Sequence, residues 1–451
     1  MVTVCAAARH AHPGGGGGRS QPVGGGLGSE PQPAPTIGHR PATVPAMSYV
    51  THLEGAIDGA RLPARTLQTL HEGRPIVVRY DLPAIRRDVD RDALATREQS
   101  LWRYRELLPL DDGDERISLG ETTTPLIDCP RLAAAMGVDR LLIKDESRLP
   151  TGSFKARGMA LAVTMAKALG VTKLAVPTAG NAGGAMAAYA ARAGIPAWVF
   201  MPDDTPVVNR LEAALFGAQA FLVDGLIQHC GAIVRAGVET MGWFDLSTLK
   251  EPYRIEGKKT MGLELADQLD WKLPDVILYP TGGGTGLIGM WKAFAELGAL
   301  GWLDSDARPR MVSCQSDGCS PMATAFDAGE RFATEAVDPH TVASGLRVPK
   351  AVGDFLILDA VRESQGFAAA TEEAGLIADM NLACATEGIS LCPESAACLG
   401  VLRAALADGR IARDETVVLF NTGATQKYVE AMEVELPRVQ RADVDWGAVA
   451  G

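Results

Sequence analysis

One lysine of this chain sits in a setting that suits covalent chemistry. Lys155 belongs to LPTGSFKARGMALAV, residues 149–163, where a Pro-Thr-Gly turn precedes an alanine-rich segment. The pattern predicts an N-cap at Ser153 and places Lys155 in the first helical turn. The positive end of the helix dipole disfavours a protonated amine there, and a lysine that forms a Schiff base must be neutral part of the time. Lys155 is therefore a candidate nucleophile, although a solvated lysine at a helix start also fits this loop taken alone.

A second candidate loop lies in VPTAGNAGGAMAAYAARAG, residues 176–194. A short apolar strand is expected to end there and to turn into a helix of very small residues. The exposed amides at a helix start, together with the Thr178 hydroxyl, suit an anion such as a substrate carboxylate. Asn181 offers both a donor and an acceptor to an aromatic hydroxyl. A tight turn with Asn181 as its cap explains the same residues equally well.

The stretch ILYPTGGGTGLIGMW, residues 277–291, predicts a phosphate-binding loop between a buried strand and a helix. Glycines let backbone N–H groups approach a phosphate, and the helix start favours its charge. The residues concerned are Gly282, Gly283, Gly284, Thr285, Gly286 and Gly289. Gly284, Gly286 and Gly289 also match the G-x-G-x-x-G pattern of dinucleotide-binding proteins, for which the next strand offers only Asp317 as a ribose partner. The lysine that ends a P-loop is absent.

A fourth loop follows the apolar stretch VVLF in VVLFNTGATQKY, residues 417–428. The hydroxyl of Thr422 is suited to meet a ring nitrogen without carrying charge. An ordinary turn at a strand end is the alternative interpretation.

The four loops share one kind of position, at the end of an apolar stretch of strand length. Strands are predicted within residues 74–82, 140–146, 173–178, 196–202, 219–225, 275–281, 310–316 and 416–423, and a turn and helix within 123–136. Helices are predicted over 181–193, 207–216, 259–269, 286–297, 366–378 and 394–407. Continuous apolar strands separated by helices indicate an α/β fold with parallel sheets covered on both faces. Ligands of such folds bind at the carboxyl ends of the strands.

Composition narrows the function further. The formal net charge of −12 argues against nucleic acid or an anionic membrane as partner. Eight scattered cysteines without a CxxC pair indicate reduced thiols in a cytoplasmic protein, and no metal site is expected. Residues 1–46 are rich in glycine and proline, and we expect a disordered tail there.

In order along the chain, the loops resemble the tryptophan-synthase-β-type (fold type II) enzymes that use pyridoxal 5′-phosphate (PLP). The resemblance runs from about residue 116 to 430 and is strongest to the threonine synthases. It is carried by TTTPLIDCPRLA, IKDESRLPTGSFKARG, PTAGNAGG, WFDLSTLKEPYRIEGKKTMGLELADQL and YPTGGGTGLIGMWKAF. It implies two α/β domains, a large PLP-binding one over 47–159 and 256–451 and a small mobile one over 160–255. It also suggests a homodimer.

The resemblance assigns roles to individual residues. It implies that Lys155 forms the Schiff base with PLP and later shuttles protons, and that Asn181 contacts the cofactor 3-hydroxyl. Thr422 would face the pyridine nitrogen. The cofactor phosphate would be cradled by Gly282, Gly283, Gly284, Thr285 and Gly286, and the substrate would be bound by Ser153, Thr178, Ala179, Gly180 and Ala182. Candidates for a substrate phosphate are Lys144, Ser153, Arg157, Asn209, Arg210, Lys258 and Lys259.

The expected reaction is that of threonine synthase, in which O-phospho-L-homoserine and water give L-threonine and phosphate. Ala156 follows the lysine where many threonine synthases have an acidic residue, and Gly423–Lys427 reads GATQK where a Gly-Ser/His-Gly-Leu-Lys run is expected. These departures keep open a threonine/serine or hydroxyaspartate dehydratase. An NAD-dependent dehydrogenase is the alternative of another class. Close relatives often carry a zinc ribbon before residue 76, but residues 51–82 contain no cysteine.

Overall fold

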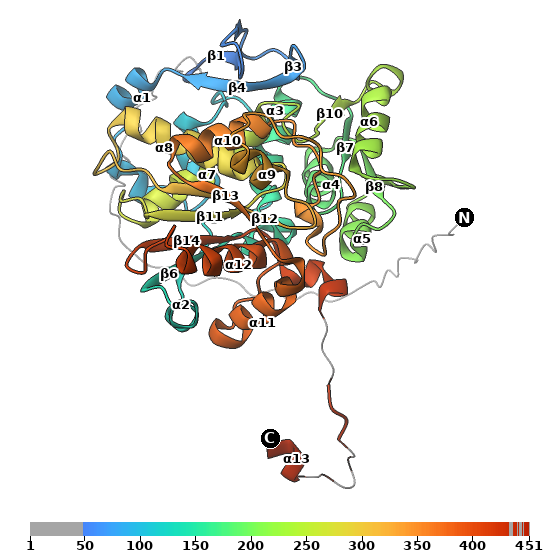
Figure 1. Cartoon of the computed structure of the whole chain (residues 1–451). Helices are drawn as coiled ribbons and strands as arrows, with labels where there is room; N and C mark the ends of the chain where they lie inside the picture. Colours follow the sequence, from blue (N-terminus) through green and yellow to red (C-terminus); the bar gives the residue numbers. More distant parts are fainter. Residues whose placement is uncertain (1–47, 433–435, 440, 442–443, 445, 451) are drawn as a thin grey trace, which may run out of the picture. The chain divides into compact units, whose positions relative to one another are not determined.

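The computed structural model describes residues 48–432, 436–439, 441, 444 and 446–450 of the chain. Its largest sheet has six strands in the order β13-β12-β11-β14-β6-β5 (Figure 1). These strands are β5 Leu126–Asp128, β6 Arg140–Asp145, β11 Val276–Pro280, β12 Arg310–Ser316, β13 Phe367–Thr371 and β14 Thr416–Asn421. All neighbours pair in parallel except β5 with β6. The central strands are buried at nearly every position, which confirms the predicted sheet covered on both faces.

A second sheet has four parallel strands in the order β10-β7-β8-β9. They are β7 Leu174–Pro177, β8 Ala197–Pro202, β9 Gln219–Val223 and β10 Phe244–Asp245, and they alternate with α4 Asn181–Ala193, α5 Val207–Leu215 and α6 Ile227–Met241. This sheet and its helices fall within residues 160–255. That these residues move as a separate small domain stays a prediction, and the predicted tail over 1–46 lies outside the described residues.

The structure describes ten further α-helices. They are α1 Leu82–Asp88, α2 Pro130–Met136, α3 Lys155–Ala168, α7 Tyr253–Gln268, α8 Thr285–Leu300, α9 Pro321–Asp327, α10 Asp354–Glu363, α11 Leu376–Glu387 and α12 Pro393–Ala407, with a short α13 Trp446–Ala450. None of the helices in the described part is long and apolar enough to cross a lipid bilayer.

The helix predicted over 366–378 is wrong. Strand β13 occupies Phe367–Thr371, and the helix that follows begins only at Leu376. The alanine-rich stretch reads as helical, but its backbone pairs with β12, where Phe367 lies opposite Val312. Tertiary pairing therefore overrides the local composition. Strand β5 was also missed, and α7 begins at Tyr253, six residues before the predicted start at 259.

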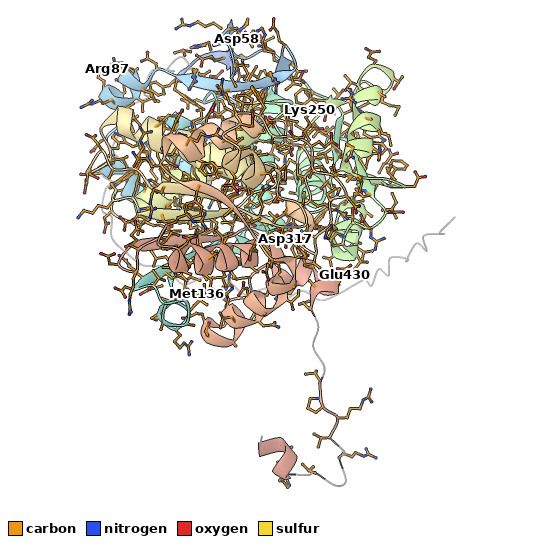
Figure 2. The ribbon with its side chains drawn as sticks, viewed as in Figure 1. Asp58, Arg87, Met136, Lys250, Asp317 and Glu430 are labelled. Atoms are coloured by element: carbon orange, nitrogen blue, oxygen red, sulfur yellow. The ribbon has the colours of Figure 1, made fainter. Side chains whose placement is uncertain are left out.

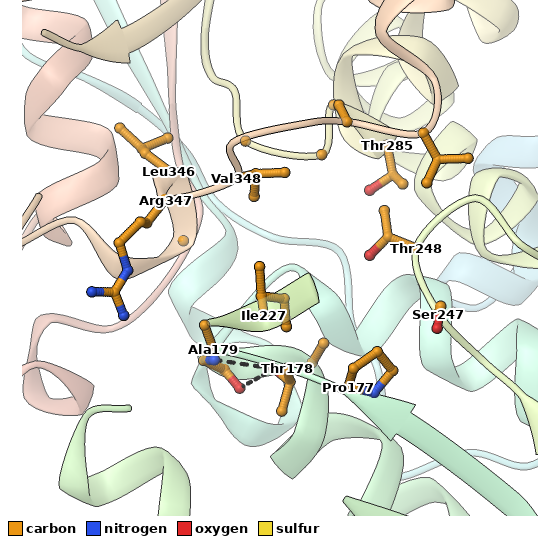
Figure 3. A pocket seen from close by; sticks show the side chains of 18 of the residues that line it. Pro177, Thr178, Ala179, Ile227, Ser247, Thr248, Thr285, Leu346, Arg347 and Val348 are labelled. Carbon is orange, nitrogen blue, oxygen red and sulfur yellow. Dashed lines mark hydrogen bonds between the residues drawn. The ribbon is translucent and has the colours of Figure 1, made fainter. Parts of the chain in front are cut away.

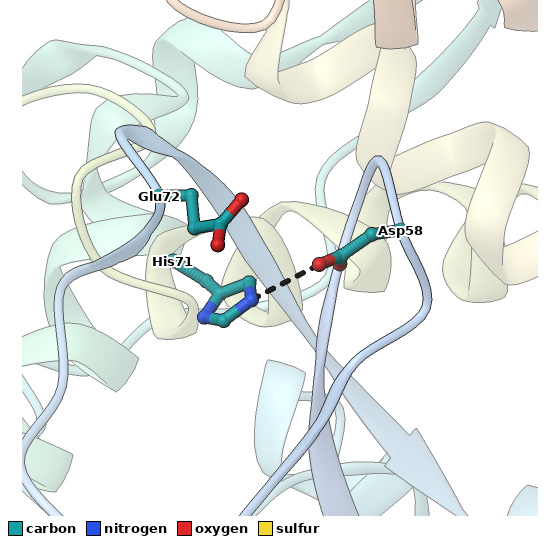
Figure 4. Close-up of side chains that lie close together, drawn as sticks. All are labelled: Asp58, His71 and Glu72. Atoms are coloured by element: carbon teal, nitrogen blue, oxygen red, sulfur yellow. Dashed lines mark hydrogen bonds and ion pairs between the residues drawn. The ribbon is translucent and has the colours of Figure 1, made fainter.

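A small antiparallel sheet precedes the main fold, in the order β2-β1-β4-β3. Its strands are β1 Val50–Gly55, β2 Arg61–Leu62, β3 Leu70–His71 and β4 Arg74–Tyr80, of which only β4 was predicted. His71 Nε2 and Asp58 Oδ2 lie 3.0 Å apart and join β3 to the turn between β1 and β2, with Glu72 beside them (Figure 4). Asp58 and Glu72 are exposed, and this hydrogen bond accounts for the pair, so we assign no metal to this group.

Buried charges fix the start of α3 against α7. Arg157 Nε lies 2.6 Å from Glu146 Oε2, and Arg157 Nη1 lies 2.9 Å from Glu264 Oε2. Lys144 Nζ contacts Glu264 Oε1 at 2.5 Å. All four side chains are at most 1% exposed. This network holds the turn that carries Lys155 in one place.

Candidate active site

The four candidate loops meet at one cavity of about 730 Å³. Three of them follow the carboxyl ends of β7, β11 and β14, and the lysine loop follows β6. The lining includes Lys155, Thr178, Ala179, Gly180, Asn181, Ala182, Gly282, Gly283, Gly284, Thr285 and Thr422. Figure 3 shows Thr178 and Ala179 on one side of the cavity, and Thr285, Arg347 and Val348 around it. Segments that are distant in the sequence thus line one cavity.

Lys155 is the first residue of α3 and is partly buried. The loop before it pairs with the Thr422 loop, because Phe154 N donates to Thr422 O at 3.0 Å and Ser153 is bridged to Gly423. Lys155 Nζ lies 3.8 Å from the centroid of the Phe154 ring. Burial, and then the Arg254 guanidinium, lower the pKa of Lys155 from 10.5 to about 7. An amine with that pKa is substantially neutral at physiological pH, as a nucleophile requires.

The Thr178 loop begins α4 with several free amides. Thr178 Oγ1 donates to Gly180 O at 2.8 Å and accepts from Gly180 N at 3.0 Å, so this hydroxyl shapes the loop. Gly180, and not Asn181, is the N-cap residue, and its cap has no side-chain bond. Asn181 Nδ2 donates to the Tyr428 hydroxyl at 2.9 Å, whereas Asn181 Oδ1 has no partner among the described residues. A helix start and an unpartnered amide oxygen thus face the same cavity.

The glycine loop leaves no room for side chains. A Cβ on Gly282 would lie 2.2 Å from Gly345 O, so the loop packs directly on the backbone of the segment 344–348. Gly284 adopts φ +70° and caps α8, a conformation that favours glycine. The first N–H groups of a helix have no acceptor within it, and here they open on the cavity beside Thr285. The arrangement is an anion-binding helix start.

The remaining glycines of that loop serve helix packing. A Cβ on Gly286 would lie 1.9 Å from the Tyr279 hydroxyl, and one on Gly289 would lie 2.9 Å from Lys258 Cβ. Neither glycine lines the cavity. Asp317, which is labelled in Figure 2, is exposed and accepts a bond from Glu373 N at 3.0 Å. It does not line the cavity either. The G-x-G-x-x-G match therefore reflects packing, and the dinucleotide interpretation loses its ribose partner.

Thr422 lies between α12 and the lysine loop. Its backbone N donates to Ser395 Oγ at 3.0 Å, and its Oγ1 lies 3.6 Å from Cys392 Sγ. Burial, and then the nearby Glu394, raise the pKa of Cys392 to about 12, so the thiol is neutral. Thr422 thus offers a hydroxyl next to a neutral thiol.

Several lining residues were missed by sequence reasoning. Glu394 accepts a hydrogen bond from Gly345 N at 2.8 Å through Oε1, and Arg254 Nη1 donates to Leu246 O at 2.7 Å. Both are buried and line the cavity with Tyr428 and Ser344. No local sequence pattern singles out Arg254, Tyr428 or Ser344. For Glu394 the only signal is its place at the start of a predicted helix.

Some predicted residues lie elsewhere. Ser153 is fully buried, does not line the cavity and is not the N-cap, which is Phe154. Four of the cations considered for a substrate phosphate, Lys144, Arg157, Lys258 and Lys259, are buried and do not line the cavity. Three of these four are neutralised by buried glutamates, and Lys258 is bound to a carbonyl.

Comparison with known proteins agrees with this geometry. The family model described as "Pyridoxal-phosphate dependent enzyme" matches residues 117–423. The threonine synthase of Methanosarcina acetivorans is 38% identical over 370 residues, covering 81% of this chain and 89% of that protein. The threonine synthase of Methanocaldococcus jannaschii is 34% identical over 358 residues, covering 79% of this chain and 88% of that protein.

Solved structures share the fold at lower identity. Maize serine racemase is 20% identical, with a TM-score of 0.58, covering 69% of this chain and 90% of that one. The processed form of threonine deaminase isoform 2 from Solanum lycopersicum is 20% identical, with a TM-score of 0.56, covering 69% of this chain and 88% of that one. Experimentally determined structures thus share the predicted α/β architecture of this chain.

Proposed function

Because the chain belongs to the pyridoxal-phosphate-dependent enzyme family, we propose that it is a threonine synthase, which converts O-phospho-L-homoserine and water into L-threonine and phosphate. The observation that carries the proposal is 38% identity to a threonine synthase across 81% of this chain and 89% of the relative. The cofactor is PLP, and the substrate is a small molecule. We further propose a cytoplasmic homodimer.

The cavity fits PLP. Lys155 has a pKa lowered to about 7, the α8 start offers amides to a phosphate, and Asn181 Oδ1 is buried without a partner among the described residues. We assign Gly282, Gly283, Gly284 and Thr285 to the cofactor phosphate. We remove Gly286 from the residues predicted to bind this phosphate, because it packs on Tyr279.

Two side chains are assigned to the ring of the cofactor. Asn181 would meet its 3-hydroxyl through Oδ1, while Nδ2 stays on Tyr428. Thr422 would meet the pyridine nitrogen with a hydroxyl and no charge. Bound PLP supplies an electron sink for negative charge at the substrate Cα.

The substrate carboxylate is assigned to the start of α4. The free amides around Ala179, Asn181 and Ala182 point a partial positive charge into the cavity next to Lys155. A substrate held there places its Cα within reach of the lysine amine. Lys155 then takes the proton from Cα and returns protons later in the reaction, as its pKa of about 7 allows at neutral pH.

Polar groups without partners mark a place for the substrate phosphate. Both amide atoms of Asn209 and the Ser344 Oγ are buried and lack partners in the described part of the chain. Ser344 Oγ and Asn209 Nδ2 lie 3.6 and 3.9 Å from where a Cβ on Gly180 would be. Ser344 lines the cavity and Asn209 does not. We assign both side chains to the phosphate, because buried donors of this kind stay unsatisfied without a ligand. Arg210, the other predicted candidate, follows Asn209 on α5 and does not line the cavity.

Residues 160–255 are linked to the rest of the protein at the edge of this site. Arg347 forms two bonds of 2.7 Å to Asp204, Lys427 lies 2.5 Å from Glu212, and Val207 N donates to Glu430 at 2.8 Å. We propose that these contacts break and re-form as residues 160–255 move to admit substrate and exclude water.

Product analysis with the PLP-supplied full chain tests the function. O-Phospho-L-homoserine, L-threonine and L-serine are added separately, and phosphate, threonine, ammonia and 2-keto acid are followed together. We expect equal amounts of phosphate and threonine from phosphohomoserine, no product with Lys155→Ala, and normal activity with Lys167→Ala at the far end of α3. Ammonia and keto acid from L-threonine or L-serine, with phosphohomoserine inert, would overturn the proposal and indicate a dehydratase.

A further inference from the structure

Lys258 on α7 is a buried lysine without a counter-ion. Its side chain is 0% exposed, and no carboxylate lies within ion-pair distance of it among the described residues. Two other fully buried lysines, Lys144 and Lys259, are paired with glutamates at 2.5 and 2.6 Å. An unpaired buried ammonium is so costly that the group sheds its proton instead. Burial, then Lys155 and Arg254, hold the pKa of Lys258 well below its usual range.

The amine of Lys258 is bound to the residue that precedes Lys155. Its Nζ donates to Phe154 O and lies 4.0 Å from the centroid of the Phe154 ring. Lys155 Nζ lies 3.8 Å from the same ring. Phe154 is also held at its N–H by Thr422 O, at 3.0 Å. Both backbone polar atoms of Phe154 are therefore fixed, and its ring contacts both amines.

Two glycines make room for the Lys258 side chain. A Cβ on Gly158 of α3 would lie 3.0 Å from Lys258 Cε, and one on Gly289 of α8 would lie 2.9 Å from Lys258 Cβ. The lysine stem thus fills a channel between three helices, and its amine ends at the first turn of α3. A shorter apolar side chain would fill part of this channel but would leave the Phe154 carbonyl with only its bond from Arg157 N.

We propose that Lys258 is a positioning residue for Lys155, acting as a neutral hydrogen-bond donor that fixes Phe154 and with it the first turn of α3. This inference rests on the proposed role of Lys155 in binding PLP. Lys258 does not line the cavity and does not touch the substrate. Its effect is on how readily the Lys155 amine reaches the carbonyl carbon of PLP.

The charges around both amines are consistent with a neutral Lys258. Lys258 is faced by Arg157 and Lys155 from α3, Arg254 from α7 and Glu146 from the turn after β6. Glu146 is already bound to Arg157. Lys155 is faced by Arg254, and further by Glu394 and Cys392 at the start of α12 and by Lys427 after β14. Since a neutral Lys258 exerts no charge on Lys155, removing it should leave the Lys155 pKa in place.

The test uses Lys258→Met, which fills the channel without a donor, and Lys258→Gln, which keeps an N–H. PLP is added to PLP-free protein over a range of pH, and bond formation is followed by absorbance and by mass spectrometry of Lys155 after borohydride reduction. We expect Lys258→Met to slow bond formation about tenfold at every pH without moving the pH midpoint, which is the loss of about one hydrogen bond. Lys258→Gln should recover most of the rate. Lys167→Met, at the far end of α3, is the matched control.

Other outcomes would overturn the inference. Wild-type rates in Lys258→Met would show that the hydrogen bond is unimportant. Equal losses in both variants would show that only packing matters, and a midpoint raised in both would show that Lys258 acts as a cation. Labelling of Lys155 in the PLP-free protein by a small amine-reactive reagent compares the same variants without the cofactor. None of these readouts uses phosphohomoserine, so a failed threonine synthase assay would not be confused with a failed inference.

Discussion

Asn181 Nδ2 donates a 2.9 Å hydrogen bond to the Tyr428 hydroxyl, which joins the start of α4 to the loop after β14. The bond orients the amide, and its Oδ1, which we assign to the cofactor 3-hydroxyl, has no partner among the described residues. Both side chains line the cavity. One hydrogen bond thus sets the orientation of Asn181, a residue that we predicted from the sequence to bind the cofactor.

Tyr428→Phe should weaken PLP binding about tenfold, because the Asn181 amide loses the partner that orients it and leaves a buried donor unsatisfied. The Kd for PLP is measured by absorbance titration. Tyr189→Phe is the control. The Tyr189 hydroxyl donates a 2.5 Å hydrogen bond to Glu121, and neither residue lines the cavity. This control should lower the free energy of unfolding and leave the PLP affinity unchanged. Equal PLP affinity in both variants would contradict the orienting role.

The rate of PLP attachment should rise with pH, with a midpoint at about 7. The reacting form of Lys155 is the neutral amine, and its pKa is lowered from 10.5 to about 7 by burial and by Arg254. The neutral fraction therefore increases as the pH rises through this pKa and levels off above it. Stopped-flow absorbance over about two pH units on either side of the midpoint checks this. A midpoint near that of free lysine would show that the amine is not perturbed.

Gly284→Ala should weaken PLP binding about tenfold or more, because alanine is strained in the left-handed region. Gly284 has φ +70°, and an added Cβ would lie 2.2 Å from Ile357 Cδ1, so the loop that we assign to the cofactor phosphate must shift. Gly298→Ala lies near the other end of α8, with nothing within 4 Å of the added Cβ. That control should gain about 0.5–1 kcal/mol of stability with normal PLP binding. A similar Kd for both variants would contradict the cradle assignment.

Arg157→Met should cost about 3–5 kcal/mol of unfolding free energy, because it leaves Glu146 buried without its cation and Glu264 with Lys144 alone. Urea denaturation of the PLP-free protein measures this. Arg413→Met breaks an exposed pair with Asp139 and should have little effect. A loss no greater than that of the exposed pair would show that the network is not needed for stability.

The same network predicts acid sensitivity. Arg157 and Lys144 lower the pKa of Glu264 from 4.5 to about 2, despite burial. A carboxyl whose folded pKa is depressed contributes stability above about pH 4.5 and loses it as pH falls toward 2. Glu264→Gln should therefore flatten the fall in unfolding free energy over that range. An unchanged acid limb would contradict the assignment.

Arg235→Gln should raise the KM for phosphohomoserine and reduce its dependence on salt, with kcat little changed. Arg235 is exposed at the cavity lining and has no ion-pair partner in the described ranges, so it can attract a dianionic substrate to a protein of net charge −12. Arg61→Gln removes the same charge from β2, away from the cavity. Identical salt dependence in the two variants would show that Arg235 does not steer the substrate.

The sequence by itself determined the fold class and pointed to the residues to which we assign the chemistry. Lys155, Asn181, Gly282–Thr285 and Thr422 were readable because each lies in a turn that ends an apolar strand, and parallel strands bring such turns to one edge. These signals are local, since they depend on glycine conformations, helix starts and strand length. Where a local signal was ambiguous, as in the alanine-rich stretch that became β13, the prediction failed.

Only the tertiary structure decided which charges face the site. Lys144, Arg157 and Lys259 look like phosphate ligands in the sequence, yet each is bound to a buried glutamate. Lys144 and Arg157 contact Glu264 of α7, and Lys259 contacts Glu256 one helical turn away. Tyr428 reaches Asn181 across 247 positions of the chain, a spacing that leaves no local pattern. The lowered pKa of Lys155 also depends on the tertiary structure, because its causes are burial and the nearby Arg254, and both arise only in the folded chain.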